Sequence, residues 1–182
     1  MTTVYFVRHG EATGNANLTF QGVTDNPLTP KGREQGKLLQ KRFAPVAYDR
    51  ILASPLSRAK ESAQILNEGH ACVVEIEPLL MEIDGGVLEG EPFATIPQNY
   101  PEELDRYQNH HLDFVGKGAT DGGVRGAWKR VETLLARLAR ESPGQTVALA
   151  AHGRVLRIFH SLVRQLPTEA LPATQCGDHT CV

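Results

Sequence analysis

Short apolar runs and stretches with helical character alternate along the chain. The runs at 4–7, 50–53, 72–76 and 146–151 have the length and continuous apolar character of buried parallel strands. Apolar side chains at helical spacing, or a helix-capping pair, predict helices at 30–43, 56–66, 128–138 and 155–166. Strands that alternate with helices predict an α/β fold. We expect a three-layer α/β/α sandwich with a mostly parallel central sheet.

The first predicted helix has a recognisable beginning and two internal glycines. Thr29 followed by Pro30 is typical of an N-cap and the first helical turn. Gly32 and Gly36 lie one turn apart and lower the helix propensity of this stretch. We expect these glycines to let the helix approach the sheet closely.

The pattern breaks down between residues 87 and 123, where prolines and scattered polar residues replace periodic apolar positions. We call residues 87–123 the flap segment. A long irregular stretch inside a compact domain is typical of a lid or a substrate-binding loop. We therefore expect one domain over 1–182, with the flap segment inserted over the carboxyl edge of the sheet.

Chemically distinctive residues follow two of the predicted strands. Arg8–Glu11, which reads Arg-His-Gly-Glu, comes directly after the run at 4–7, and His152 with Gly153 follows the run at 146–151. Open α/β sheets bind ligands at the carboxyl ends of their strands. A cation, a titratable imidazole and a glycine that permits close backbone approach therefore point to an anion-binding site at this edge.

Composition excludes several classes of protein. The 182 residues are 41% hydrophobic and 22% charged, with a formal net charge of −2, values that are ordinary for a globular domain. This charge does not predict a nucleic-acid partner, and no apolar run is long enough to span a bilayer. Three cysteines are too few for a disulfide scaffold, and the chain opens in a strand instead of a signal peptide. We expect a cytoplasmic protein without nucleic-acid or membrane partners, and leave a homodimer open.

Two clusters invite a metal or ligand interpretation that we do not favour. Residues 176–181 hold Cys176, His179 and Cys181, one soft ligand short of a structural zinc site. A final strand with incidental polar residues is the preferred interpretation. His110 and His111 in the flap segment are interpreted as exposed polar residues. No metal and no cofactor are expected.

Five blocks of the sequence resemble the signature of the histidine phosphatase superfamily, also called phosphoglycerate-mutase-like. They occur in the family's order between residue 3 and about residue 160, a range that spans most of the chain. The blocks are Arg8–Glu11 with Asn15, Gly22–Thr29, Ala53–Ala59, Leu80–Gly90 and Ala151–Gly153. Several ordered blocks carry far more weight than one short motif.

The resemblance implies a catalytic set and a phosphate pocket. His9 would attack phosphorus and carry the phosphoryl group, and Arg8 and Arg58 are planar cations suited to phosphate oxygens. His152 would be cationic and donate to an equatorial oxygen, while Glu82 would carry the proton for the leaving group and then for water. Further phosphate contacts are expected from Asn15, Gln21, Gly22 and Gly153.

Some assignments leave alternatives open. Glu82 is chosen over Asp84 because Gly86 and the Glu89-Gly90 pair complete the block around it. Glu11 is expected to shape its loop or to pair with an arginine. Where many family members have Gly-Glu-Ser, this chain has Gly122–Gly126 with a cation at Arg125. That arginine would contact a second anionic group or lie on the surface.

Three functions are consistent with these features. The leading hypothesis is a metal-independent phosphomonoesterase for a small phosphorylated metabolite. The chain lacks the Glu-Arg-His-Tyr-Gly block of the cofactor-dependent phosphoglycerate mutases, which makes a mutase the second hypothesis. The third, a catalytically silent phosphate-binding regulatory domain, is disfavoured by the complete set of candidate catalytic residues.

Overall fold

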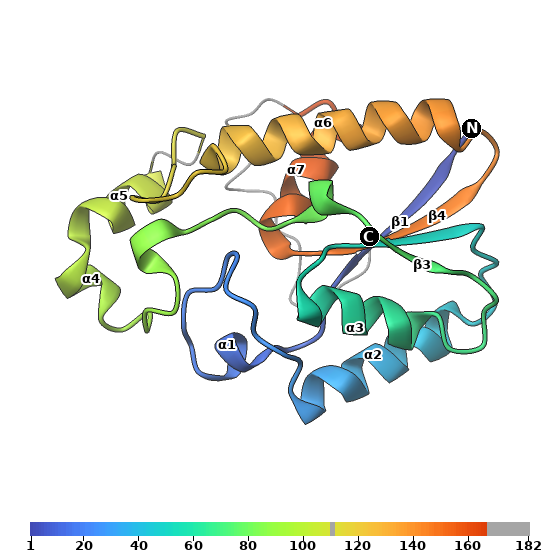
Figure 1. Cartoon of the computed structure of the whole chain (residues 1–182), viewed down its shortest axis with the longest axis horizontal. Helices are drawn as coiled ribbons and strands as arrows, with labels where there is room; N and C mark the ends of the chain where they lie inside the picture. The colour runs from blue at the N-terminus through green and yellow to red at the C-terminus, as the bar shows by residue number, and fades with distance from the viewer. Residues whose placement is uncertain (110–111, 167–182) are drawn as a thin grey trace.

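The computed structural model describes residues 1–109 and 112–166 (Figure 1). In this part of the chain, parallel strands form one sheet in the order β1-β4-β2-β3. The strands are β1 (Thr3–Arg8), β2 (Arg50–Ala53), β3 (Val74–Ile76) and β4 (Thr146–Ala151). The predicted α/β fold with a parallel sheet is confirmed. The third strand is shorter than the predicted 72–76.

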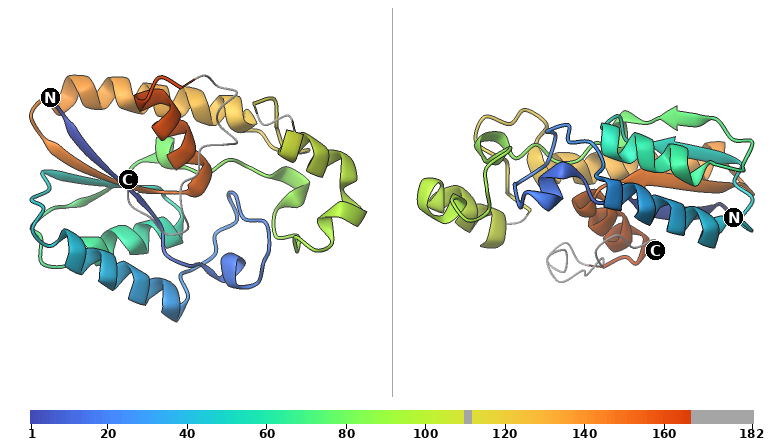
Figure 2. Two further views of the ribbon diagram at one scale, coloured as in Figure 1. Left: turned by 180° about the vertical axis from the view of Figure 1, so that it is seen from behind. Right: turned by 90° about the horizontal axis from the view of Figure 1, so that it is seen from below.

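Helices cover both faces of the sheet, as Figure 2 shows from two sides. Helices α2 (Pro30–Phe43) and α3 (Ser57–Leu66) cover one face, and α6 (Gly123–Glu141) and α7 (Gly153–Val163) cover the other. The central strand β4 divides its buried side chains between the two layers. Ala148 and Ala150 pack toward α2 and α3, whereas Val147 and Leu149 pack toward α6 and α7. This two-sided burial explains why the strand reads as a continuous apolar run.

The strand register places the functional residues side by side. Arg8 of β1 is paired with Ala151 of β4, and the His9 N–H donates to the Ala151 carbonyl at 3.0 Å. Ser54, directly after β2, donates its N–H to Ala150 at 3.0 Å. The residues that follow three adjacent strands therefore meet at one edge of the sheet.

The glycines of α2 serve a different contact from the predicted one. A Cβ at Gly32 would lie 2.1 Å from the Glu11 carbonyl oxygen, and one at Gly36 would lie 3.2 Å from Ile65 of α3. The helix therefore closes on the loop after β1 and on α3, not on the sheet, so the predicted partner was wrong. Thr29 is the N-cap, as predicted, and its hydroxyl accepts from the Gly32 N–H at 3.0 Å.

The flap segment contains more regular structure than predicted. The short helices η2 (Gly86–Leu88), α4 (Ile96–Asn99) and α5 (Pro101–Asn109) lie within or at its start, and Figure 1 shows α4 and α5 beyond one end of the sheet. Pro97 and Pro101 stand in the first turns of α4 and α5, where a missing N–H costs nothing. Helix α6 begins at Gly123, before the predicted start at Trp128. The remaining short helices of the described chain are α1 (Thr13–Ala16) and η1 (Pro78–Leu80).

His110, His111 and residues 176–181 lie outside the described residues. In the described ranges, no helix has the length and apolar character needed to cross a membrane. The cytoplasmic location and the homodimer stay predictions.

Candidate functional site

A cavity of about 180 Å³ opens at the carboxyl ends of the strands. Eight of the nine site residues predicted from the sequence line it; the exception is His152. These eight are Arg8, His9, Asn15, Gln21, Gly22, Arg58, Glu82 and Gly153. The cavity is smaller than the roughly 300–1,000 Å³ of pockets for drug-sized ligands, so it suits a small ligand.

The His9 imidazole is fixed by the peptide that follows it. Its Nδ1 lies 2.7 Å from the Gly10 carbonyl oxygen, and the side chain is 3% exposed. A carbonyl only accepts hydrogen bonds, so Nδ1 carries the proton and Nε2 keeps its lone pair in the neutral ring. The Gly10 N–H donates to the Ser62 hydroxyl at 3.1 Å. His9 is therefore oriented with a nucleophilic nitrogen available.

His152 lies directly beside His9, but deeper in the protein. The two ring centroids are 5.2 Å apart, and His152 is 1% exposed. Its Nε2 lies 2.8 Å from the Ser54 hydroxyl, while Nδ1 is buried without a hydrogen-bond partner in the described chain. Burial lowers the His152 pKa well below its ordinary value, and the positive charges of Arg58, His9 and Arg8 lower it further. Burial and the neighbouring positive charges therefore favour the neutral imidazole over the predicted cationic form.

Arg58 is a buried, tightly held cation. It stands in the first turn of α3 and is 1% exposed. Its two terminal nitrogens donate to the carbonyl oxygens of Gly22 at 2.6 Å and Thr24 at 2.8 Å. Burial lowers the Arg58 pKa from its ordinary value. The guanidinium of Arg8 lies beside Gly153, 3.5 Å from where a Cβ on that glycine would stand.

Glu82 holds its carboxylate in the cavity by two backbone contacts. Oε1 accepts from the Ile83 N–H at 2.9 Å, and Oε2 accepts from the Arg154 N–H at 3.0 Å. The alternative candidate, Asp84, does not line the cavity; its carboxylate accepts from the Gly86 N–H at 2.8 Å. The geometry therefore favours Glu82 over Asp84 as the acid of the site.

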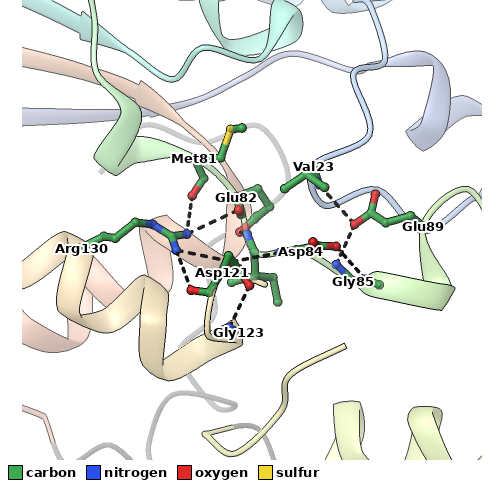
Figure 3. Close-up of polar contacts among 11 residues, drawn as sticks. Val23, Met81, Glu82, Asp84, Gly85, Glu89, Asp121, Gly123 and Arg130 are labelled. Carbon is green, nitrogen blue, oxygen red and sulfur yellow. Dashed lines mark hydrogen bonds and ion pairs between the residues drawn. The ribbon is translucent and has the colours of Figure 1, made fainter. Parts of the chain in front are cut away.

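Glu89 was not predicted as a functional residue, yet it organises the loop that holds Arg58. Its carboxylate accepts N–H hydrogen bonds of 2.8–3.2 Å from Gly22, Val23, Thr24 and Gly85. The Thr24 hydroxyl donates to the same carboxylate. Figure 3 shows Glu89 between Val23 and Gly85. One carboxylate thus joins the loop that supports Arg58 to the segment that carries Glu82.

A second network fastens the Glu82 segment to α6 (Figure 3). Arg130 donates to the Met81 carbonyl at 3.0 Å and pairs with Asp121 at 3.4 Å. Asp121 in turn accepts from the N–H groups of Asp84 at 3.2 Å and Gly123 at 2.8 Å. Since both partners are only 20% exposed, this ion pair is shielded from solvent more than a surface pair.

Glu11 and Arg125, two charged residues considered as candidates from the sequence, do not line the cavity. Glu11 shapes its loop, as predicted, and its carboxylate pairs with Lys31 at 2.8 Å. Its other oxygen accepts from the Thr29 hydroxyl at 2.8 Å. Arg125 pairs with Asp113 at 2.7 Å in an exposed contact. The surface interpretation of Arg125 is the one that its position supports.

Sequence reasoning missed part of the cavity wall. The missed lining residues are Thr19, Phe20, Ile83, Phe93, Tyr107, Arg154 and Arg157. The sequence could have indicated Arg154 and Arg157, because they follow His152 and are three residues apart in a predicted helix. Side chains at this spacing lie on one face of the helix. No sequence pattern indicates the aromatic residues, since their contact with the cavity depends on how the flap segment folds back over it.

Comparison with known proteins agrees with this site. The family model of the histidine phosphatase superfamily (branch 1) matches residues 4–182. "Probable phosphoglycerate mutase GpmB" of Cronobacter sakazakii is 31% identical over 172 residues, which are 93% of this chain and 78% of that protein.

Two solved structures are similar in fold. The α-ribazole phosphatase from Shigella flexneri is 25% identical with a TM-score of 0.88, covering 98% of this chain and 87% of that one. YhfR of Bacillus stearothermophilus is 31% identical with a TM-score of 0.86, covering 96% and 86%. Fold, ordered sequence blocks and family match agree: the chain belongs to the histidine phosphatase superfamily.

Proposed function

We propose that this protein is a metal-independent phosphomonoesterase that hydrolyses a small phosphorylated metabolite through a phosphohistidine on His9. The observation that carries the proposal is the 2.7 Å contact between His9 Nδ1 and the Gly10 carbonyl. It holds the proton on Nδ1 and leaves Nε2 as the nucleophile beside two arginines. The kinship with an α-ribazole phosphatase structure supports a phosphatase of this type.

In the first step, Nε2 of His9 attacks phosphorus as the ester P–O bond breaks. Arg8 and Arg58 balance the charge on the phosphoryl oxygens, and positioning with charge stabilisation is most of what phosphoryl transfer requires. Glu82, protonated, gives its proton to the departing alkoxide, so the product leaves as an alcohol.

In the second step, water attacks phosphorus and the P–N bond breaks. The Glu82 carboxylate takes the water proton, inorganic phosphate leaves, and neutral His9 and protonated Glu82 are restored. His152 accepts a proton when the anionic substrate enters and donates to a phosphoryl oxygen. The 5.2 Å between the centroids of the His152 and His9 rings supports this role.

A phosphoglycerate mutase is the alternative reaction, favoured by the GpmB relative. The two reactions differ in the acceptor, which is water in one and a second alcohol in the other. A mutase would isomerise 3-phosphoglycerate in the presence of a bisphosphoglycerate, with little release of phosphate. A silent regulatory domain would hydrolyse no member of a broad panel of phosphate esters.

The test is hydrolysis of p-nitrophenyl phosphate in EDTA by the wild type, His9→Ala and the control His70→Ala. His70 packs against Tyr48 and does not line the cavity. We expect the His9 variant to lose at least ~10³-fold in kcat/KM, the usual scale for removing a nucleophile. The His70 variant should keep wild-type activity. Full activity of His9→Ala would sink the proposal.

A rapid-quench experiment tests the covalent intermediate. We expect labelled phosphoenzyme that is acid-labile and alkali-stable in the wild type and absent from His9→Ala. Glu82→Gln should slow the hydrolysis of alkyl phosphates more than that of p-nitrophenyl phosphate, whose leaving group needs little protonation. Equal slowing of both substrates would remove Glu82 from the role of general acid.

A further inference from the structure

We infer that the substrate carries a second anionic group, a carboxylate or a second phosphate, which Arg154 and Arg157 bind at the start of α7. The inference rests on the proposed phosphatase function and narrows its substrate class. Its first observation is that positive charge exceeds negative charge in the cavity. The charged side chains of the lining are four arginines and one glutamate. Arg8 and Arg58 are accounted for by the phosphate ester.

Arg154 and Arg157 are placed to act together. They stand three residues apart in α7 (Gly153–Val163), so their side chains leave the helix on the same face. Both line the same cavity as His9. The two arginines on this face of α7 can therefore bind one anionic group through two of its oxygens.

Arg157 supplies the clearest sign of a missing ligand. Its Nε is buried and has no hydrogen-bond partner in the described part of the chain. A buried donor on a charged group is costly when unsatisfied. The fork of a guanidinium matches the paired oxygens of a carboxylate or phosphate. Because this Nε has almost no accessible surface, an anion in the cavity would pair with the terminal N–H groups of Arg157.

Arg154 is held in place from two directions. Its guanidinium carbon lies 4.7 Å from the centre of the Tyr107 ring, and the side chain is 7% exposed. Tyr107 is itself fixed by edge contacts with Phe20 at 5.3 Å and Phe114 at 5.2 Å. A guanidinium whose face lies on a ring directs its N–H groups along its own plane. Because the Arg154 N–H also binds Glu82, the second site has a fixed relation to the reacting bond.

Cavity size limits the distance between the two anionic groups. The space of about 180 Å³ suits a short carbon skeleton between the ester phosphate and the second anion. The aromatic rings of Phe20 and Phe93 flank this space and pack against the carbon skeleton of a ligand. The expected substrate class is a small phosphorylated acid or a small bisphosphate.

Matched pairs of substrates test the inference directly. The pairs are 3-phosphoglycerate with glycerol 3-phosphate, O-phosphoserine with O-phosphoethanolamine, and propanediol bisphosphate with propanediol monophosphate. In each pair one member lacks the second anion. We expect at least one pair to show a kcat/KM ratio of ~10 or more in favour of the doubly anionic member. The pair with the largest ratio separates carboxylate from phosphate.

Variants locate this preference in the structure. Arg157→Gln and Arg154→Gln should each bring the ratio close to one. The control Arg125→Gln removes an exposed arginine that pairs with Asp113, and it should leave the ratio at the wild-type value. Because each ratio compares two substrates of one protein, a general loss of activity cancels. Circular dichroism identifies a variant that fails to fold, and the half-buried Arg157 serves where Arg154→Gln does not fold.

Ratios near one for all three wild-type pairs, alongside hydrolysis of p-nitrophenyl phosphate, would overturn the second site and leave the phosphatase standing. A large ratio that both arginine variants retain would also overturn it. Calorimetric binding of the same pairs to His9→Ala needs no turnover, so it decides the point even if hydrolysis fails. Equal affinities within every pair would count against the inference there.

Discussion

Glu89 and Arg58 hold opposite sides of one short loop. The carboxylate accepts from the N–H groups of residues 22–24, and the guanidinium donates to the carbonyls of Gly22 and Thr24. The peptide dipoles between them are aligned with both charges. A Cβ at Gly22 would lie 2.0 Å from the Ile83 carbonyl oxygen, so only glycine permits this arrangement. The position of Arg58, which lines the cavity, therefore depends on an acid that does not line it.

Replacing Glu89 by glutamine tests this dependence. The amide brings an N–H group toward backbone N–H groups and removes the charge, so we expect KM for p-nitrophenyl phosphate to rise and kcat/KM to fall about 10–100-fold. This corresponds to losing one or two hydrogen bonds to a charged group. Glu91→Gln is the matched control, because the Glu91 side chain makes no polar contact within the described residues. Equal kinetics in the two variants would contradict the expectation.

Arg130→Gln should weaken the support of Glu82 without entering the cavity. The substitution removes the ion pair with Asp121 and the bond to the Met81 carbonyl. We expect the hydrolysis of an alkyl phosphate to fall more than that of p-nitrophenyl phosphate, because only the former needs a well-placed acid. Urea unfolding should show a loss of about 1–3 kcal/mol. If Arg125→Gln has the same effects, the network has no special role.

The stability of the ligand-free protein should fall in mild acid because of His152. Its folded pKa is lowered, so as pH drops through about 6.5 the unfolded chain binds a proton that the folded chain does not. The free energy of unfolding should therefore decrease by about 1 kcal/mol more in the wild type than in His152→Gln between pH 7.5 and 5.5. Urea titrations at both pH values measure this difference. Parallel pH dependence in the two proteins would show that the pKa of His152 is not lowered in the folded state.

The two glycines of α2 should respond differently to alanine. A methyl group at Gly36 would meet the flexible end of Ile65 at 3.2 Å, so helix propensity should offset the crowding. At Gly32 the methyl group would meet the Glu11 carbonyl oxygen at 2.1 Å, where the backbone must move. We expect Gly32→Ala to lower the unfolding free energy by about 1–3 kcal/mol and to reduce activity through the adjoining His9 loop. Equal stabilities of the two variants would argue against this contact.

The sheet and its edge were predictable because their signals are local. Strands β1, β2 and β4 each contain a short continuous apolar run, and the residues after them come together by the geometry of a parallel sheet. This pattern predicted that His9 and His152 follow strands at the ligand-binding edge, and the pairing of β1 with β4 in the structure brings their rings together. Arg58 followed from its sequence block, although its burial did not.

Other parts of the site depend on contacts between distant segments. Helices α4 (Ile96–Asn99) and α5 (Pro101–Asn109) are too short for a periodic apolar pattern to reveal them. Six acidic residues lie between positions 75 and 91, and the sequence does not indicate the partner of each. In the structure, Glu75 pairs with Arg50 and Glu77 pairs with Arg137. Glu89 accepts hydrogen bonds from backbone N–H groups.

The start of the flap segment is tied to the phosphate-side loop by backbone hydrogen bonds. Phe20 donates to Glu91 at 2.8 Å, Gly90 to Phe20 at 2.9 Å, and Phe93 to Leu18 at 2.9 Å. These hydrogen bonds fix the position from which the chain continues beyond Phe93. The segment after Phe93 can consequently be exchanged without removing any of them. A different segment in place of residues 94–109 must supply one aromatic ring that contacts Arg154, as Tyr107 does here. The residues around His9 need no change.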